Sequence, residues 1–377
     1  MRVLLLEPCY DRSVTDISYA FLYSNRADLD ALVVTTRDVP AKGIWRLPRY
    51  EDADGIPVHR LYRNFFEMSM FPQKSLSQIL RLARDFGPEV IFCSLAGNMR
   101  IAVALKKHLG TPIVLAVEYA GNIALNCSRS RRQSVFMQVF GVPYGSGYWK
   151  WLSKWSDAVI TFYPNDQYVF SGLSRFGAKM FFVPWCNAPS SFIVKNRVEG
   201  RAMYAGMFSK FKNTEEFLQT IPFLMEETPT KEFVFLGSGS AHDVRVVETL
   251  RKKYGTRIQH LIALPRVEAM KLLSGCHYAY TPVRTGGWGF IGDCWATRTP
   301  LVMTHNDYCA TAGVDTMVTS PEDIAITVNE IYGDQDLYRS LQESGYKHYL
   351  KEHTVESVGH KIMEVVTYVH EKKQAQG

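Results

Sequence analysis

The stretch RTGGWGFIGDCWATRTP, Arg284–Pro300, is the most unusual part of this chain. Glycines alternate with aromatic residues in its first half, and its second half reads as a buried helix with one acid, Asp293. A helix that begins after glycines leaves its first N–H groups unbonded, and such an end binds phosphate groups. The simpler alternative is a tight turn and a helix whose dipole Asp293 compensates. The sequence on either side of this stretch decides between the phosphate site and the simple turn.

Both neighbours of this stretch read as buried strands, HYAYTPV at 277–283 and PLVMTH at 300–305. Further upstream, strand-like runs alternate with helical patterns, and Asn213 or Thr214 is a plausible N-cap for one helix. The strand-like runs are RAMYAG at 201–206, KEFVFLGSGS at 231–240 and RIQHLIAL at 257–264; the helical ones are NTEEFLQTIPFLME at 213–226 and VRVVETLRKKYG at 244–255. The second half therefore predicts alternating strands and helices.

The first half repeats this rhythm. RVLLLEP at 2–8 and DALVVTT at 30–36 read as buried strands, and helix–turn–strand patterns follow at 76–95, 98–119 and 149–164. Runs that are apolar throughout indicate strands buried on both faces, as in a parallel sheet between helices. We therefore predict an α/β protein of two doubly wound, Rossmann-like domains that face each other across a cleft. In such sheets ligands bind in loops after the strands.

The segment FFVPWCNAPSS, residues 181–191, is the predicted hinge. We place the first domain at 1–185, the second at 186–352 and a C-terminal helical segment at 353–377. Its last helix, around Val355–His370, is expected to cross back toward the first domain.

The composition fits a two-domain globular protein, with 377 residues, 46% hydrophobic and 21% charged. A net charge of +6 without a dense Lys/Arg stripe fits an anionic small ligand and does not favour nucleic acid. The seven cysteines are scattered, which indicates a reducing, cytoplasmic setting. No apolar stretch reaches transmembrane length, so any membrane contact would be peripheral, at the inner face of a membrane.

The C-terminal half resembles the retaining glycosyltransferases of family 4, which have the GT-B fold. YAGMFSKFKNTEEFL, residues 204–218, is similar to the family's strand, short loop, lysine and helix. The next stretch, residues 233–283, follows the family element by element, and GGWGFIGDCWATRTPLVM resembles its Glu-Gly-Phe-Gly segment with a second acid eight residues after the first. In the first half the resemblance rests on the strand–helix rhythm, GPEVIF and SDAVITF.

The chain departs from the family pattern at positions that face the sugar and the phosphates. Met207 replaces an arginine, Thr285 replaces the first acid, and Glu118 replaces a histidine that often follows a strand of the first domain. Lys212 is kept, and the second acid is Asp293.

The resemblance implies roles for individual residues of the second domain. Asp293 accepts hydrogen bonds from the donor's ribose, and Lys212 neutralises the diphosphate as it leaves. Gly206 ends the first strand of this domain. Lys210 either supplies the positive charge of the arginine that Met207 replaces or is an ordinary solvated lysine. Residues that line the diphosphate cradle at the start of the helix are Gly289, Phe290, Ile291, Gly292 and Asp293.

Three further positions have more than one interpretation. In the family the backbone at the positions of Ala263 and Leu264 binds the nucleobase. Because side chains take little part in this contact, the sequence does not distinguish uracil from guanine. Arg266 either touches phosphate or stays in solvent. Glu118 either holds a sugar hydroxyl, or accepts the acceptor's proton, or is an ordinary loop acid.

The expected function is transfer of a sugar from a nucleotide-diphosphate sugar, UDP- or GDP-linked, to an acceptor hydroxyl, with retention. The acceptor is a carbohydrate, a lipid-linked molecule or a small molecule. Met207 and Thr285 keep open an inactive binding or partner subunit of the same fold, and an epimerase is a third alternative. No tightly bound cofactor is expected.

Two other features of the sequence have alternative interpretations. Asp-x-Asp pairs at Asp28/Asp30 and Asp52/Asp54 do not follow buried strands as a metal–diphosphate site requires, so we predict no required metal. The segment Ser128–Trp155 is basic and aromatic. It fits contact with anionic lipid or a carbohydrate acceptor, or the packed core of a helix beside a solvated loop.

Overall fold

The structure is a computed structural model. The structure describes residues 1–8, 10, 17–38, 46–117, 146–162, 173–187, 196–208, 213–282, 288–303, 309, 313–314 and 316–375. The chain forms two compact units, Met1–Pro184 with Val358–Gly377, and Trp185–Ser357. The first change of unit, between Pro184 and Trp185, falls inside the hinge predicted at 181–191. The expectation that the two sheets face each other across a cleft stays a prediction.

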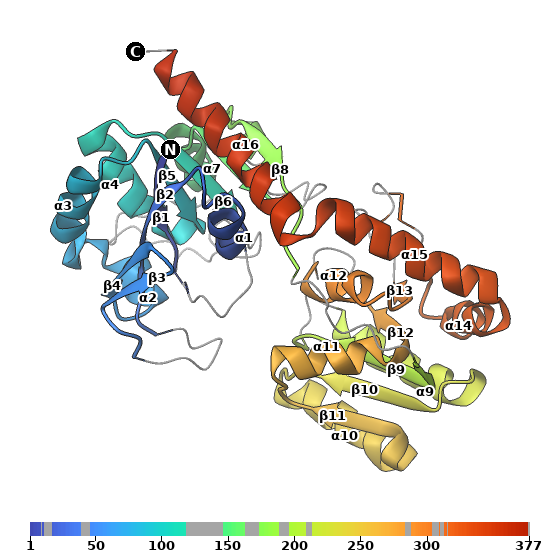
Figure 1. The fold of residues 1–377 in the computed structure, drawn as a ribbon. Helices are drawn as coiled ribbons and strands as arrows, with labels where there is room; N and C mark the ends of the chain where they lie inside the picture. The colour runs from blue at the N-terminus through green and yellow to red at the C-terminus, as the bar shows by residue number, and fades with distance from the viewer. Residues whose placement is uncertain are drawn as a thin grey trace. The chain divides into compact units, whose positions relative to one another are not determined.

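In the described part of the first unit, an eight-stranded sheet has the order β3-β4-β2-β1-β5-β6-β7-β8 (Figure 1). Every neighbouring pair is parallel except β3 and β4. The strands are β1 Arg2–Leu6, β2 Asp30–Thr36, β3 Tyr50–Ala53, β4 Ile56–Tyr62, β5 Val90–Ser94, β6 Ile113–Val117, β7 Ala158–Thr161 and β8 Met180–Phe182. The helices are α1 Ile17–Ser24, α2 Phe65–Met70, α3 Leu76–Phe86, α4 Met99–Leu109, α7 Ser146–Trp155 and α16 Val355–Gln374, with short 3-10 turns η2 Pro72–Lys74 and η3 Ala96–Asn98.

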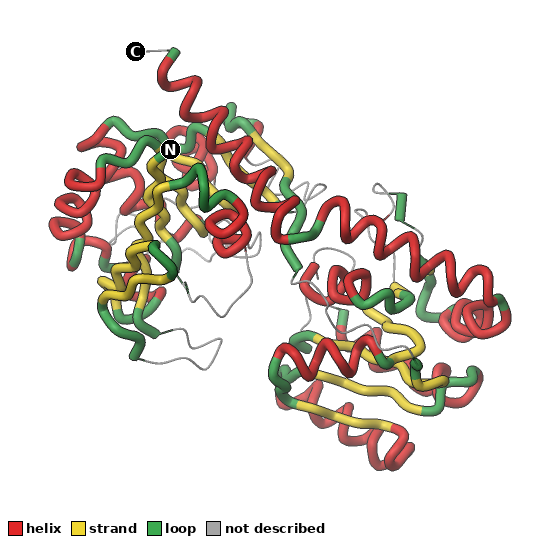
Figure 2. The backbone as a smooth tube through the Cα atoms, viewed as in Figure 1, coloured by secondary structure: helices red, strands yellow, loops and turns green. Residues whose placement is uncertain are grey.

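The second unit has a parallel sheet in the order β11-β10-β9-β12-β13-β14 among its described residues. Helices α9 and α10 pack together, as do α11 and α12, and helices cover both faces of the strands (Figure 2). The strands are β9 Val198–Ala205, β10 Glu232–Leu236, β11 Ile258–Leu261, β12 Cys276–Thr281, β13 Leu301–Met303 and β14 Met317–Val318. The helices are α9 Thr214–Glu227, α10 Ala241–Tyr254, α11 Arg266–Ser274, α12 Trp288–Ala296, α14 Ile324–Gly333 and α15 Gln335–Glu352, with the 3-10 turn η5 Gly255–Arg257. The predicted α/β class with two parallel sheets is confirmed.

The central strands of both sheets pair in parallel and are apolar on both faces, as strands covered by helices on each side require. The β1 segment Val3–Leu6 and all of β5 and β6 are fully buried. In the second unit the core is aromatic, with the Phe217 ring 4.8 Å from Tyr204 and 5.1 Å from Tyr280 between centroids. Each such aromatic pair adds about 0.5–1.5 kcal/mol beyond its buried area. This packed core fixes the positions of the carboxyl ends of the strands.

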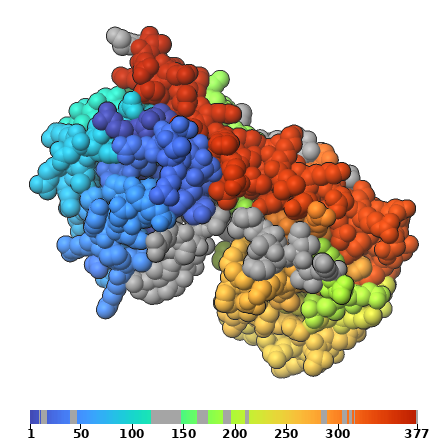
Figure 3. Space-filling model, viewed as in Figure 1, coloured from blue at the N-terminus to red at the C-terminus, as the bar shows by residue number. Residues whose placement is uncertain are grey.

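The last helix, α16, belongs to the first unit from Val358 onward and lies on the outside of that unit (Figure 3). Its apolar side chains are buried, and it crosses α1 so closely that a Cβ at Gly359 would lie 2.3 Å from the carbonyl oxygen of Ala20. Asn25 Nδ2 donates to Gly359 O at 2.9 Å. Glycine at 359 is therefore required for this contact.

The β3–β4 hairpin was not expected from the sequence. Its turn places Asp54 and Gly55 at positive φ, 58° and 85°, which matches the Asp-Gly preference of tight hairpin turns. Asp52 Oδ1 accepts the N–H of Gly55 at 2.5 Å. The Asp52/Asp54 pair thus closes a turn, and Asp30 stands at the amino end of β2.

Among the described residues, no helix combines the length and apolar character needed to span a bilayer. Nor do these residues contain a group of three or more His, Cys, Asp or Glu side chains arranged to hold a metal ion. The absence of a required metal stays a prediction.

Candidate functional site

The strand order of the second unit defines where a ligand would bind. The chain runs from β9 outward to β10 and β11, then returns to the other side of β9 with β12. Loops diverge at this reversal, so open α/β sheets bind ligands at the carboxyl ends of these two strands. Gly206 follows β9 and Pro282 follows β12. The side chain of Asn213 joins these two loops, because its Nδ2 donates to Pro282 O at 3.3 Å. Asn213 occupies the predicted N-cap position of α9 but makes no side-chain capping bond there.

Backbone contacts hold the loops after β9, β10 and β11 against one another. Gly206 N donates to Leu236 O at 2.9 Å, and Gly237 N donates to Leu261 O at 2.7 Å. Gly206 and Gly237 have φ values of 154° and 143°, and a Cβ at Gly237 would lie 2.1 Å from Gly206 O. Glycine at 237 is therefore required, and the backbone at this edge is fixed.

Helix α12, Trp288–Ala296, carries most of the predicted cradle. Ile291 is fully buried, whereas a Cβ built at Gly289 meets nothing within 4 Å. Phe290 packs edge-on against Tyr204, with ring centroids 5.8 Å apart. The far end of the helix is fixed by the Arg197 guanidinium, which donates to Thr297 O at 3.0 Å and also to Arg298 O. The first turn of α12 thus presents an open glycine above a buried, anchored helix.

Asp293 lies on the buried side of α12 and is 5% exposed. Both of its oxygens accept hydrogen bonds from the Arg266 guanidinium in a bidentate ion pair, and Oδ1 also accepts from Asn187 Nδ2 at 3.1 Å. Burial raises the pKa of the Asp293 carboxyl above its ordinary value, and the hydrogen bonds and charge of Arg266 oppose this rise. Arg266 is thus the ion-pair partner of the predicted site acid, a contact that the sequence did not suggest, while its side chain remains 53% exposed. Whether it also touches a phosphate stays a prediction.

Asn187 is 2% exposed and links α12 to the segment that enters the second unit. Its Nδ2 also donates to Gly289 O at 2.9 Å, and its backbone N donates to His353 O at 3.0 Å. A Cβ at Gly292 would lie 2.0 Å from Asn187 Oδ1, so only glycine leaves room for this amide. The glycine at 292 is explained by packing against Asn187.

Sequence reasoning missed Asn187 because it is 106 residues away from Asp293 in the chain. The one available signal was its place in the predicted hinge, next to Trp185 and Cys186.

Ala263 and Leu264 lie in the short loop between β11 and α11, as expected for a loop that presents its backbone. Ala263 is exposed and Leu264 is partly exposed. Arg266 begins α11 directly after this loop, so the predicted base-reading loop and the predicted ribose acid are joined by one ion pair.

Three predicted site residues, Glu118, Lys210 and Lys212, lie outside the described residues, as does Thr285. Their roles stay predictions. Met207 is described, and it is 61% exposed directly after Gly206.

The first unit has a corresponding reversal between β1 and β5. Glu7 follows β1, is 3% exposed and accepts a hydrogen bond from Ser18 Oγ. The buried Asn98 donates to Leu6 O at 3.2 Å and to Ser94 O at 2.8 Å, which joins the ends of the two strands. Neither residue was predicted from the sequence, although a lone acid directly after the first buried strand was a usable signal.

Comparisons with known proteins agree with this architecture. Neither family models nor curated protein sequences match the chain. Solved structures do match it. Sucrose-phosphate synthase from Thermosynechococcus elongatus has a TM-score of 0.74 at 13% identity, covering 98% of this chain and 99% of that one.

Two further solved structures show the same fold. HepE from Anabaena in complex with UDP and glucose has a TM-score of 0.66 at 12% identity, with 98% and 100% coverage. The α,α-trehalose-phosphate synthase (UDP-forming) from Burkholderia vietnamiensis has a TM-score of 0.70 at 12% identity, with 99% coverage of both chains. The chain therefore has the two-domain GT-B fold of nucleotide-sugar glycosyltransferases, as its resemblance to family 4 implied.

Proposed function

We propose that the protein is a glycosyltransferase that moves a sugar from a nucleotide-diphosphate sugar to an acceptor hydroxyl. The observation that carries this proposal is the carboxylate of Asp293, buried on α12 beside the strand reversal of a GT-B fold. UDP is the first nucleotide to test, because HepE was solved with UDP and glucose and the trehalose-phosphate synthase is UDP-forming.

The hydrogen bonds of Asp293 leave room for a ribose. A carboxylate has about four lone-pair positions, two on each oxygen. Oδ1 accepts from Arg266 and Asn187, whereas Oδ2 accepts only from Arg266 among the described residues. A ribose hydroxyl would take the second position of Oδ2. Arg266 would keep Asp293 ionised, since an ionised oxygen is the better acceptor.

The start of α12 would hold the diphosphate. Its first N–H groups and the helix dipole attract anions, and the open space beside Gly289 allows a phosphate to approach the backbone. Lys212 would neutralise the charge that develops on the leaving diphosphate, with Lys210 as a second point charge. No protein-bound metal has a role in this scheme.

The acceptor would bind at the carboxyl edge of the first sheet, where Glu7 and Asn98 lie and where Glu118 follows β6. A carboxylate at this edge would hold a sugar hydroxyl or accept the proton of the attacking hydroxyl. The acceptor is a carbohydrate, a lipid-linked molecule or a small molecule, and transfer with retention follows from the resemblance.

One observation favours a second candidate, a binding subunit that transfers no sugar. Met207 is 61% exposed where the resembled family has an arginine. The second unit would then bind a nucleotide without turnover.

Isothermal titration with UDP, GDP and their glucose conjugates tests the proposal, followed by donor turnover with an acceptor panel. Asp293→Ala should abolish nucleotide binding. The matched control is Asp336→Ala, an acid that is 94% exposed at the start of α15. Binding without turnover in any acceptor panel would favour the binding subunit. Equal nucleotide affinity in Asp293→Ala and Asp336→Ala would refute the proposed site.

A further inference from the structure

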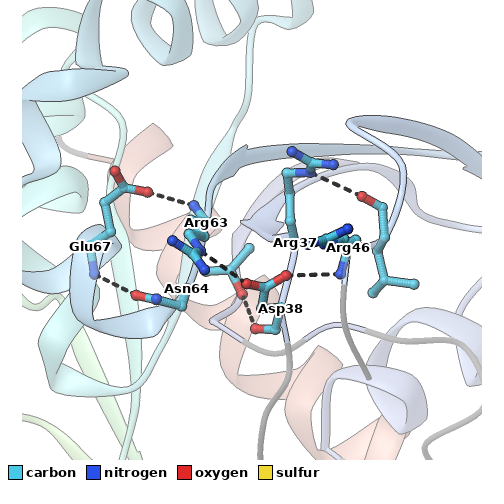
Figure 4. A network of polar contacts seen from close by, with 8 residues as sticks. Arg37, Asp38, Arg46, Arg63, Asn64 and Glu67 are labelled. Carbon is cyan, nitrogen blue, oxygen red and sulfur yellow. Dashed lines mark hydrogen bonds and ion pairs between the residues drawn. The ribbon is translucent and has the colours of Figure 1, made fainter. Parts of the chain in front are cut away.

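A cluster of arginines lies at the carboxyl edge of the first sheet, after strands β2 and β4 (Figure 4). Arg37 directly follows β2, and Arg63 directly follows the neighbouring parallel strand β4. Arg37 N donates to Tyr62 O at 2.9 Å, and Asp38 N donates to Arg63 O at 2.8 Å. The two strand ends are thus hydrogen-bonded to each other, and both arginines stand at the sheet edge where α/β folds bind ligands.

A third arginine joins them through Asp38. Arg46 N donates to Asp38 Oδ1 at 2.8 Å, and Leu47 N donates to Arg37 O at 3.0 Å. Arg46 has a φ of 58°, a conformation that non-glycine residues seldom adopt and that persists only when neighbouring contacts fix it. We call Arg37, Arg46 and Arg63, with Asp38 between them, the arginine cluster.

The guanidinium groups of Arg37 and Arg63 are each held at Nε, which leaves their outer ends unbonded among the described residues. Arg37 Nε donates to Leu47 O at 3.1 Å, and Arg63 Nε donates to Asp38 Oδ2 at 3.3 Å. The terminal Nη atoms of both arginines have no partner among the described residues, and the Arg63 side chain is 79% exposed. Anchoring at Nε fixes the plane of each guanidinium, which is the arrangement that binds a two-oxygen anion in bidentate fashion.

The charge balance of the cluster is positive. Asp38 is its one carboxylate among the described residues, and it is 7% exposed. The nearby Glu67 accepts from Arg63 N at 2.6 Å, but its charge is balanced by an ion pair with Lys74 Nζ at 2.5 Å. Three arginines against one acid leave two positive charges, and a phosphate monoester carries about −1.5 to −2 at neutral pH.

We propose that the arginine cluster binds a phosphate monoester on the acceptor. This inference rests on the proposed function, and it defines the acceptor class as phosphorylated. The ester comes either from a soluble sugar phosphate or from the headgroup of a lipid, since both present the same dianion.

The test is calorimetric titration of the full-length protein at low salt with glucose 6-phosphate, glucose and inorganic phosphate. Saturating UDP is present to occupy the diphosphate site of the second unit. Glucose 6-phosphate should bind and glucose should not. Arg37→Gln and Arg63→Gln should each weaken binding about tenfold, the loss expected for one charge-assisted hydrogen-bonded contact. The affinity of Arg63→Lys for glucose 6-phosphate should lie between those of wild type and Arg63→Gln, because lysine keeps the positive charge but lacks the planar guanidinium that binds two oxygens.

Arg81→Gln is the matched control, because it removes the same charge from an exposed position on α3. Its affinity should stay within about twofold of wild type, since a distant exposed charge is screened by salt. Melting temperatures of all variants show whether the fold is retained.

The lipid source is tested by sedimentation with phosphatidylcholine vesicles that contain phosphatidic acid. Binding that is lost in Arg37→Gln and absent with pure phosphatidylcholine would assign the lipid source. The proposal is wrong if no phosphate probe loses affinity in Arg37→Gln or Arg63→Gln. If UDP does not bind but glucose 6-phosphate does, the cluster stands and the proposed function fails.

Discussion

Removal of the Arg266 side-chain charge is the sharpest test of the site in the second unit. In Arg266→Met the apolar stem is retained, and the buried carboxylate of Asp293 loses the guanidinium that bonds both of its oxygens. Asn187 would remain as its one partner among the described residues. Leaving a buried charge unpaired costs several kcal/mol, but the Arg266 side chain is 53% exposed, so water recovers part of this loss. We expect a destabilisation of about 1–3 kcal/mol at neutral pH.

The loss should depend on pH in a defined direction. Burial already raises the pKa of Asp293, and Arg266 is the group that opposes the rise. Without Arg266 the folded-state pKa moves further above the unfolded value of about 3.9. A group whose folded pKa is raised favours folding below its unfolded pKa and loses that contribution as pH rises through the folded pKa. The variant should therefore be closest to wild type below about pH 4 and weakest at pH 7–8.

Thermal melting across this pH range measures the effect. Each pKa unit corresponds to about 1.4 kcal/mol, and one kcal/mol shifts the melting temperature of a domain of this size by about 2–4 °C. Other groups that feel the Asp293 charge are Cys294 and Tyr349. Arg266→Met/Asp293→Asn removes the titrating group and should flatten the difference from wild type. A loss of equal size at pH 5 and pH 8, unchanged in the double variant, would refute the reasoning.

Four other outcomes are expected. Asn187→Ala should destabilise the second unit by about 1–3 kcal/mol in chemical denaturation, because it removes the amide that bonds α12. Gly292→Ala places a Cβ 2.0 Å from Asn187 Oδ1 and should cost about 1–3 kcal/mol, with much of it recovered in the double variant with Asn187→Ala. Gly359→Ala should lower the melting temperature, because its Cβ meets the backbone of Ala20, which cannot yield as a side chain can. Lys212→Ala should lower kcat with less effect on nucleotide affinity, and equal losses in both would contradict its role at the leaving group.

The parallel sheets could be predicted because the information is local. The runs VLLL in β1 and VIFC in β5 are apolar at consecutive positions, which a strand exposed on one face does not require. Gly110 ends α4 at a φ of 70° directly after a basic last turn, which is a common way for a helix to end. The hairpin of β3 and β4 was missed although Asp54-Gly55 is a strong turn signal. The alternating burial of β4 was the second signal.

Only those features of the site that depend on a single segment of the sequence could be predicted. Helix α12 and the burial of Asp293 follow from the stretch Arg284–Pro300 itself. The partners of Asp293 do not, because Arg266 and Asn187 lie 27 and 106 residues away and neither belongs to a motif with α12. A long side chain such as that of arginine has several possible partners, and only the folded structure determines which of them it contacts.

The two places where the chain passes into and out of the second unit are bonded to each other and to this site. Asn187 N donates to His353 O at 3.0 Å, and His353 Nδ1 lies 2.8 Å from Trp185 O. The same Asn187 side chain bonds Asp293 and Gly289 on α12. A shift of either crossing segment would therefore alter the hydrogen bonds of the carboxylate that we expect to hold the nucleotide. Because linkage is reciprocal, a nucleotide that fixes Asp293 must also stabilise one arrangement of these segments, whatever sugar it carries.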